Sequence, residues 1–131
     1  MAGRAALIVM AVLLAGSCGA APTGPSPTGQ WGGDHIALTV TASGSHAELD
    51  CAHGDITEPI ESSTFRLAGT FVREHGGPIA IGESPDTHPA IYLGTVVGDA
   101  MTLTIRVTDT NEAIGSYTLT RGATGHIVKC L

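Results

Sequence analysis

Basic residues are scarce in this chain. Lysine and arginine together number 6, against 12 aspartates and glutamates, which gives a formal net charge of −6. No cluster of basic residues interrupts this acidic background. Nucleic acids and anionic lipid surfaces are bound mainly through concentrated positive charge. The composition therefore argues against nucleic acid as a partner and against direct electrostatic adhesion to a membrane.

Long apolar runs are also missing. The longest uninterrupted run, Ala5–Ala15, has about 11 residues, whereas a membrane-spanning helix needs roughly 20. It follows a single positive charge, Arg4, near the N-terminus, and small residues come after it. This layout is typical of an export signal and not of a core helix. We therefore expect residues 1–17 to be a signal peptide and the remaining chain to act outside the cytoplasm.

The end of this signal contains the segment Leu14-Ala15-Gly16-Ser17-Cys18. It resembles the lipobox of bacterial lipoproteins, although Ala15 stands where leucine is usual. The resemblance implies a diacylglyceryl group on Cys18 and a cell-envelope protein held to a membrane by this lipid anchor. Cleavage after Ala20, which would give a secreted or periplasmic protein, is the alternative. Residues 18–28 are rich in proline, glycine, serine and threonine and predict an extended linker.

Cysteine is rare, with 3 residues in the chain. If Cys18 belongs to the signal, Cys51 and Cys130 remain for the folded domain. Because an exported compartment permits oxidation, we expect these two cysteines to form a disulfide. Closing a loop of roughly 80 residues would stabilise the fold by about 4 kcal/mol in the chain-entropy description. Two buried free thiols are the alternative.

Helical periodicity is absent from residue 29 onward. Apolar and polar residues alternate with a period of two, and Gly, Pro, Asp and Asn interrupt the alternation at short intervals. This pattern predicts short antiparallel strands. We expect residues 29–131 to form one small all-β domain. An up-and-down meander of about seven to eight strands would close into a barrel and so remove its edge strands. A β-sandwich is the alternative.

Two hairpins can be placed in register from their turns. One turns at Gly98-Asp99 and the other at Gly44-Ser45, and both are read as two-residue turns. In each hairpin, pairing across the turn puts apolar residues on one face. The expected pairs are Val96–Met101, Gly94–Leu103 and Tyr92–Ile105 for the former, and Val40–Leu49 and Leu38–Cys51 for the latter. A weak strand is expected at residues 56–60, and further strands are expected at residues 65–71, 115–121 and 126–130.

Aromatic residues are few, with 1 Trp, 2 Tyr and 2 Phe. The tryptophan lies in Gly29-Gln30-Trp31, which resembles the G-x-W motif that opens lipocalins and other calycins. In that superfamily a basic residue near the last strands packs over the tryptophan and closes one end of the barrel. The resemblance gives this part to Arg121, through a cation–π contact. A lone tryptophan that plugs one end of any small β domain is the alternative.

A second resemblance covers nearly all of residues 31–131. The segments that carry it are residues 31–35, 50–54, 88–90, 98–104 and 129–131. They are similar to segments of short exported bacterial proteins and lipoproteins of unknown function. This resemblance implies an exported single domain and no particular activity.

Catalytic signatures are missing as well. The chain has no G-x-S-x-G elbow, no H-E-x-x-H pair and no glycine run that would cradle a phosphate. We therefore expect a protein that is not an enzyme and that has no cofactor. The 6 histidines leave one alternative open, a His-dependent metal or haem binder, because several of them fall at strand ends or in loops. These are His35, His53, His75 and His88, although no metal-ligand spacing joins them.

The longest segment without a strand pattern runs from Glu74 to Pro89. Such segments in compact domains often bind or cover a ligand, although this one could also be a disordered excursion. Mixed charge at its rim makes it the candidate binding loop, with Arg73, Glu74, His75, Asp86 and His88 as its residues. We expect a lipid-anchored domain that binds a small molecule or a protein partner through this loop or the open end of the barrel. A protein–protein module, such as an inhibitor of an envelope enzyme, is the alternative.

The lipid anchor can be tested with Cys18→Ala. Two or three acyl chains hold a protein stably on a membrane, and the substitution removes their attachment point. We expect the variant to move from the membrane fraction to the soluble exported fraction, as measured by fractionation and immunoblotting. Equal membrane retention of the variant and the unmodified protein would contradict this prediction.

Overall fold

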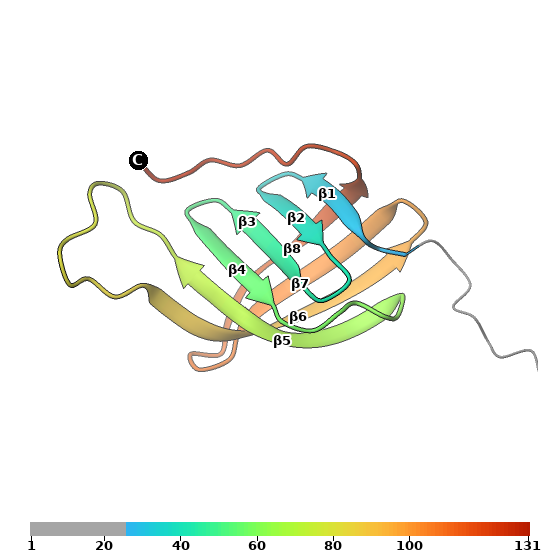
Figure 1. Ribbon diagram of the computed structural model, residues 1–131, viewed down its shortest axis with the longest axis horizontal. Coiled ribbons are helices and arrows are strands. Elements are labelled where there is room, and N and C mark those ends of the chain that lie inside the picture. The colour runs from blue at the N-terminus through green and yellow to red at the C-terminus, as the bar shows by residue number, and fades with distance from the viewer. Residues whose placement is uncertain (1–25) are drawn as a thin grey trace, which may run out of the picture.

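The computed structural model describes residues 26–131, so that the expected signal peptide, residues 1–17, and Cys18 lie outside the described residues. The described chain is all-β. Its eight strands are β1 (Gly29–Gly33), β2 (Ile36–Val40), β3 (Ser45–Leu49), β4 (Ala52–Ile56), β5 (Thr64–Arg73), β6 (Asp86–Val97), β7 (Ala100–Val107) and β8 (Glu112–Arg121). Each strand pairs antiparallel with the next, and β1 pairs with β8 to close a barrel (Figure 1). The expected up-and-down barrel is confirmed, and the sandwich alternative does not hold. Within residues 26–131, no helix is long and apolar enough to span a membrane.

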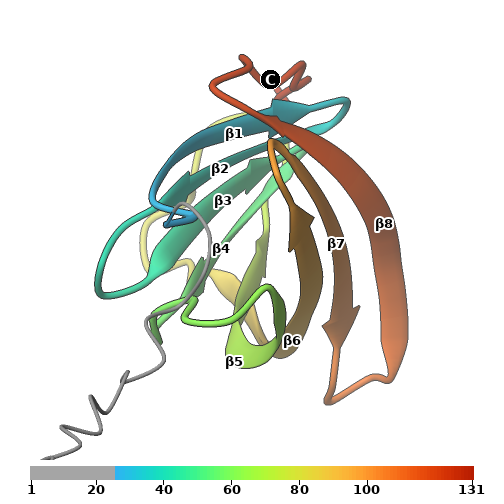
Figure 2. The same cartoon turned by 90° about the vertical axis from the view of Figure 1, so that its right-hand side faces the viewer.

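The two halves of the barrel differ in strand length. Strands β1 to β4 have 5 residues each, whereas β5, β6, β7 and β8 have 10, 12, 8 and 10. Closure between β1 and β8 depends on two residue pairs, Trp31–Arg121 and Gly32–Thr120. The first part of β8 therefore has no partner on β1, and the β7–β8 hairpin extends away from β1–β4 (Figure 2). One end of the barrel is consequently less enclosed than the other.

We call the end at which β1 begins the closed end. Trp31 is fully buried there, and its indole N–H donates to the Pro27 carbonyl at 2.7 Å. The guanidinium carbon of Arg121 lies 4.4 Å from the centroid of the Trp31 ring. Arg121 also donates to the Ser26 carbonyl at 2.9 Å and pairs with Asp99 at 3.1 Å. Together these contacts tie the N-terminal segment, β1, the β6–β7 turn and β8 to one another.

Large side chains fill the barrel, and small residues make room for them. Phe65 pairs with Gly94, and a Cβ atom at Gly94 would overlap the Phe65 ring. Tyr92 is fully buried and donates from its hydroxyl to the Thr70 carbonyl at 2.6 Å. A Cβ atom at Gly54 would overlap that hydroxyl. The other fully buried large side chains are Trp31, Ile36, Leu38, Met101, Leu103, Ile105, Val107 and Leu119.

The predicted register of the hairpin that turns at Gly98-Asp99, formed by β6 and β7, is confirmed. Val96 pairs with Met101, and the neighbouring pairs are Gly94–Leu103 and Tyr92–Ile105. Gly98, at the turn, has a φ of 59°, a left-handed conformation that glycine adopts without steric cost. The turn residues and the apolar alternation of these two long strands agree, which is why the pattern was sufficient here.

The predicted register of the hairpin near Gly44-Ser45, formed by β2 and β3, is wrong. Leu38 pairs with Ala47 and not with Cys51. The turn spans residues 41–44, and the amide of its first residue donates to the carbonyl of its last at 2.8 Å. The difference shifts the pairing by an even number of residues, so that the apolar side chains of β2 still face the core.

Two turns of this half of the barrel contain no glycine. β1 and β2 are joined by Asp34-His35, and β3 and β4 by Asp50-Cys51. His35 and Cys51 have φ values of 69° and 48°. Turns of this kind usually place Asn or Gly in the left-handed region, so the sequence pattern gives no signal for them. As a result β1 was not expected as a strand, and β4 lies at residues 52–56 instead of 56–60.

The strand expected at residues 126–130 is also wrong. These residues belong to a C-terminal strap, residues 122–131, which runs over the outside of the barrel (Figure 1). Its sheet-like contact is an isolated bridge between His126 and Asp34. The strap bonds to backbone groups of β1 that β8 leaves unpaired, since the Gly122 amide donates to the Gln30 carbonyl at 2.7 Å and the His126 amide to the Gly33 carbonyl at 3.0 Å, but these single bonds do not form a ladder. Glycine permits its close approach, since a Cβ atom at Gly32 would overlap the strap backbone.

Candidate binding end of the barrel

The open end lies opposite the closed end. Its connections are residues 34–35, 50–51, 74–85 and 108–111. Three of these connections hold the non-glycine residues with positive φ among residues 26–131, namely His35, Cys51 and Asn111. Asparagine tolerates this conformation, but histidine and cysteine adopt it at a cost that neighbouring contacts must offset. Backbone strain in the described chain is therefore concentrated at the open end.

A hollow of about 290 Å³ lies in this end, and we call it the mouth hollow. Leu49 and Phe71, which are 2% and 3% exposed, form its base. Ile114 and Tyr117 of β8 are partly buried beside them. Ile114 is the extra residue of a β-bulge, and bulges commonly redirect a side chain at a barrel rim. The remaining lining residues are His35, Asp50, Ala52 and Gly115.

The polar groups of the mouth hollow centre on Asp50. One carboxylate oxygen accepts from the Val128 amide at 2.7 Å, and the other lies 2.5 Å from Nδ1 of His35. The hydrogen bond from the Val128 amide lowers the pKa of Asp50, so that the carboxylate is ionised at neutral pH. Burial raises the pKa of Tyr117, and the nearby Asp50 charge adds to this effect. No hydrogen bond contributes to this shift.

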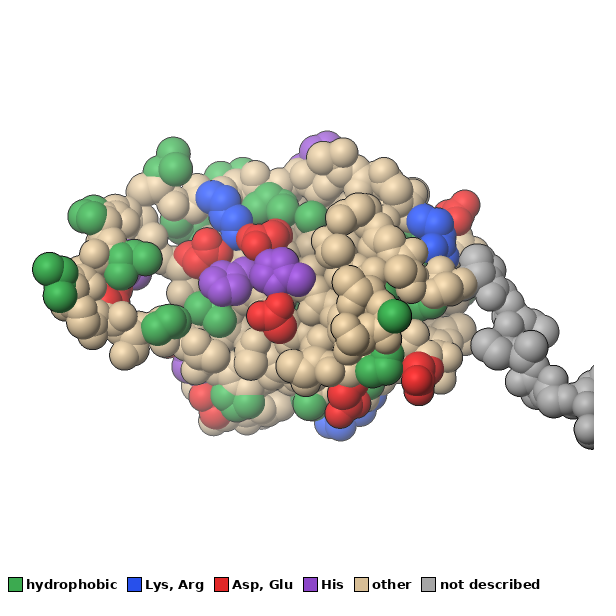
Figure 3. Space-filling view, viewed as in Figure 1, with side chains coloured by type: hydrophobic (Ala, Val, Ile, Leu, Met, Phe, Trp, Pro, Cys, Tyr) green, Lys and Arg blue, Asp and Glu red, His purple; other side chains and the backbone are tan. Residues whose placement is uncertain are grey.

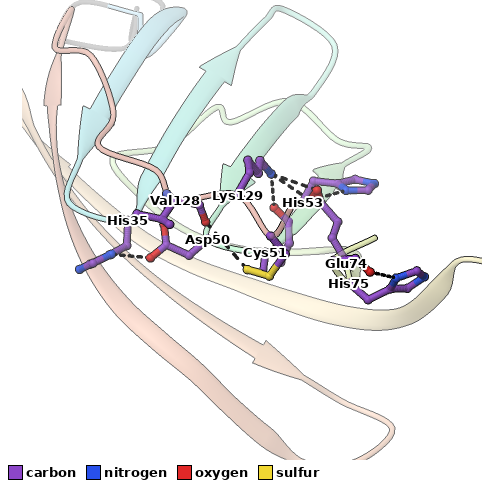
Figure 4. The surroundings of a disulfide bond; sticks show 11 residues. His35, Asp50, Cys51, His53, Glu74, His75, Val128 and Lys129 are labelled. Carbon is purple, nitrogen blue, oxygen red and sulfur yellow. Dashed lines mark hydrogen bonds and ion pairs between the residues drawn. A yellow bond between two sulfur atoms is a disulfide. The ribbon is translucent and has the colours of Figure 1, made fainter. Parts of the chain in front are cut away.

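The predicted disulfide between Cys51 and Cys130 is present, with a Cα–Cα distance of 5.0 Å across 79 residues of sequence (Figure 4). It fastens the strap to the β3–β4 turn. Beside it, Nζ of Lys129 donates to the Ala52 carbonyl at 3.0 Å and pairs with Glu74 at 2.9 Å. Lys129 also pairs with Glu48 at 2.6 Å. The strap is thus joined covalently and by ion pairs to the β3–β4 hairpin and to the first residue after β5.

The connection between β5 and β6, which we call the 74–85 loop, is braced from within. The amide of Glu74 donates to the Cys51 carbonyl at 2.8 Å. The His75 ring contacts the carboxylate of Glu83. That carboxylate also accepts from the Ala80 amide at 2.9 Å, and the Glu83 amide donates to the Ala80 carbonyl at 3.1 Å. These contacts hold the loop in one shape although it projects from the barrel.

The tip of the 74–85 loop is apolar and exposed. Ile79 is 78% exposed and Ile81 is 108% exposed. Figure 3 shows hydrophobic side chains along the projecting loop, away from the body of the barrel. The residues predicted for this loop are charged ones, and they do not include the two isoleucines. The sequence shows that both isoleucines lie in a segment punctuated by Gly and Pro, outside any strand pattern.

The charged residues predicted for the binding loop divide into two groups. Arg73 and Asp86 are cross-strand partners at the base of the loop. His88 lies 2.9 Å from Asp86 and 2.7 Å from Asp109, and Arg73 pairs with Glu112. Arg73, Asp86 and His88 therefore lie together beside the β7–β8 hairpin. The two carboxylates that this hairpin contributes, Asp109 and Glu112, were not predicted. The other two, Glu74 and His75, contact Lys129 of the strap and Glu83 of the loop.

Every one of the 6 histidines contacts at least one carboxylate. On the outer face of β3 and β4, the rings of His46 and His53 lie with centroids 6.1 Å apart. Figure 3 shows two histidine side chains side by side among acidic ones and a basic one. The metal alternative requires His53 and at least two other histidines to lie within coordination distance of one ion. Within residues 26–131, no three His, Cys, Asp or Glu side chains form such a group.

Comparison with protein families, with curated proteins and with solved structures finds no match for this chain.

The histidine–carboxylate pairs predict how stability depends on pH. Hydrogen bonds to Glu48 and Asp109 raise the pKa values of His46 and His88, so their contribution is full below about pH 6.5 and is lost at higher pH. The Lys129 ammonium and the Val128 amide lower the pKa values of Glu74 and Asp50, so their contribution is lost as the pH falls below about 4. We expect the midpoint of chemical denaturation to be highest between these limits, and lower at pH 8.5 than at pH 5.5.

His88→Gln provides the control for this prediction, because it removes one titrating pair from the exposed rim. The difference between pH 5.5 and pH 8.5 should shrink in this variant. A midpoint that increases steadily from pH 5.5 to pH 8.5 in the unmodified protein would contradict the prediction.

Proposed function

We propose that this protein is a non-enzymatic, lipid-anchored interaction protein of the cell envelope, and that its barrel presents the 74–85 loop to a protein partner. The observation that carries the proposal is the pair of exposed isoleucines, Ile79 and Ile81, on an internally braced loop. Isoleucine is among the residues most often buried in folded proteins. Burying one such side chain at an interface contributes roughly 1.5–3 kcal/mol. The tip therefore supplies most of the apolar surface available for binding on this loop.

The contacts at the base of the loop support binding by a preformed element. The Cys51 carbonyl, Lys129 and His53 all contact Glu74, and the carboxylate of Glu83 closes the loop higher up. A loop that is already ordered loses less conformational entropy when it binds. The disulfide next to Lys129 strengthens the same arrangement, because it fixes the strap that carries the ammonium group.

Charge indicates what kind of surface would receive the loop. With Arg4 outside the described residues, 5 basic side chains face 12 acidic ones in the barrel and strap. Around the loop, Glu83, Asp109 and Glu112 add negative charge. A second copy of this chain and an anionic bilayer would both be repelled by this rim. We therefore propose a partner with an apolar cleft bordered by basic residues.

The position of Ser26 indicates how the barrel would be oriented relative to a membrane. Ser26, the first described residue, contacts Arg121 at the closed end. A lipid on Cys18 would therefore hold the closed end towards the membrane. The 74–85 loop lies at the opposite end of the barrel and would face away from the bilayer (Figure 1). A partner would thus be reached without competition from the lipid surface.

This proposal is tested by placing a photo-crosslinking amino acid at position 81 of the full protein in cells. The matched control carries it at position 97, because Val97 is 72% exposed at the closed end. We expect position 81, and not position 97, to crosslink to one protein. Purified, that protein should bind with an affinity that falls with increasing salt, and Ile79→Asp with Ile81→Asp should weaken binding at least about 100-fold without lowering thermal stability.

Equal crosslinking from both positions, or none from position 81, would contradict the proposed function. Crosslinks to lipid or to a second copy of the chain would contradict the proposed partner.

A further inference from the structure

We infer that the mouth hollow is a binding site for a small molecule that has a short apolar or aromatic body and a hydrogen-bond-donating head that is neutral or cationic. This site is distinct from the 74–85 loop and does not depend on the protein partner proposed above. The inference is based on the lining of the hollow, the direction of its polar groups and the reason why it stays open.

The base of the hollow suits an apolar body. Leu49 and Phe71 are buried core residues whose remaining exposed surface faces the hollow. The bulge of β8 places Ile114 at its side, and the ring of Tyr117 lies next to it. Small-molecule sites typically combine such an apolar lining with a few placed polar groups. The volume, about 290 Å³, limits the body to roughly one ring.

The polar groups define the head. The Asp50 carboxylate can only accept hydrogen bonds, so Nδ1 of His35 carries the proton between them. In the neutral imidazole, Nε2 is then an acceptor, and in Figure 4 it is turned away from Asp50. The hydroxyl of Tyr117 is another polar group of the lining. A ligand head that donates to Nε2 of His35 and contacts the Tyr117 hydroxyl would give both groups a hydrogen-bond partner.

Charge excludes the opposite type of head. Asp50 contributes a negative charge to the lining, and no lysine or arginine lines the hollow. A carboxylate placed there would be repelled by Asp50. An ammonium head would be attracted, and a hydroxyl head would be accepted without repulsion.

The structure also gives a reason for the hollow to persist. The first part of β8 has no partner on β1, because closure ends at two residue pairs. The wall formed by the β1–β2 and β3–β4 turns is held in place, since the His35 amide donates to the His126 carbonyl at 2.8 Å and Cys51 is bonded to Cys130. Both residues keep left-handed backbone conformations, as strained residues at binding sites often do.

Three probes of matched shape test this inference: 2-phenylethylamine, 2-phenylethanol and phenylacetate. Each is titrated into the intact, oxidised protein, and binding is followed by two-dimensional NMR of the backbone amides. We expect saturable shifts at His35, Asp50 and Gly115 with the amine and the alcohol. Phenylacetate should bind at least 10-fold more weakly than the amine.

Two variants separate the contributions of the polar groups. Tyr117→Phe, which keeps the ring, should weaken the amine and the alcohol several-fold. Asp50→Asn, which can still accept from the Val128 amide, should remove the preference of the amine over the alcohol. His46→Gln, on the outer face of β3, is the control and should change neither affinity.

Phenylacetate binding as tightly as the amine would overturn the inference. So would the absence of saturable shifts at the mouth for all three probes, or shifts confined to residues 74–85. Because the test does not involve a protein partner, its failure would leave the proposed function of the loop unaffected.

Discussion

The rest of the structure depends on how the barrel closes. Four strands of 5 residues are joined to four longer ones, and β1 meets β8 in only two residue pairs. At the closed end this short seam is reinforced by Trp31, which is buried beneath the guanidinium of Arg121. Beyond the seam, the first part of β8 has no strand beside it on the β1 side. The open end is a direct consequence of this mismatch in strand length.

The strap connects turns at the open end that the pairing of β1 with β8 does not join. It leaves β8 at the closed end, contacts the β1–β2 turn through His126, and ends at the β3–β4 turn through the Cys51–Cys130 disulfide. Lys129 then joins this turn to Glu74 at the base of the 74–85 loop. The strap therefore holds the two turns that carry His35 and Asp50 of the mouth hollow, and it fixes the loop that projects beside the hollow. This shared support explains why the two proposed binding features lie at one end of the barrel.

Local patterns predicted the part of the fold in which turn chemistry and strand alternation agree. Gly98 and the long alternating strands on either side of it fix the register of β6 and β7 without any tertiary information. The β1–β4 half was not predictable in this way. Its turns place His35 and Cys51 in left-handed conformations that only tertiary contacts make tolerable, namely the strap and the disulfide.

The candidate site likewise divides into features that local sequence patterns predict and features that depend on tertiary contacts. Charged residues at the loop base could be picked from the sequence because they flank a segment without strand pattern. Their partners could not, since Glu112 and Lys129 lie 39 and 55 residues away from the residues they contact, Arg73 and Glu74. The mouth hollow was not predictable either, because it arises from the short closure seam and from the bulge at Ile114. Both are properties of the assembled sheet.

The central claim is that the disulfide-held strap, and not the β1–β8 ladder, maintains the open end. Amide hydrogen exchange of the oxidised protein and of the Cys51→Ser/Cys130→Ser variant tests it most directly. The account predicts that the amides of His35, Glu74 and Val128, which donate to strap or turn groups, lose protection in the variant. Amides in the β6–β7 ladder should keep theirs. Unchanged protection at these three amides, or an equal loss throughout the barrel, would contradict the account.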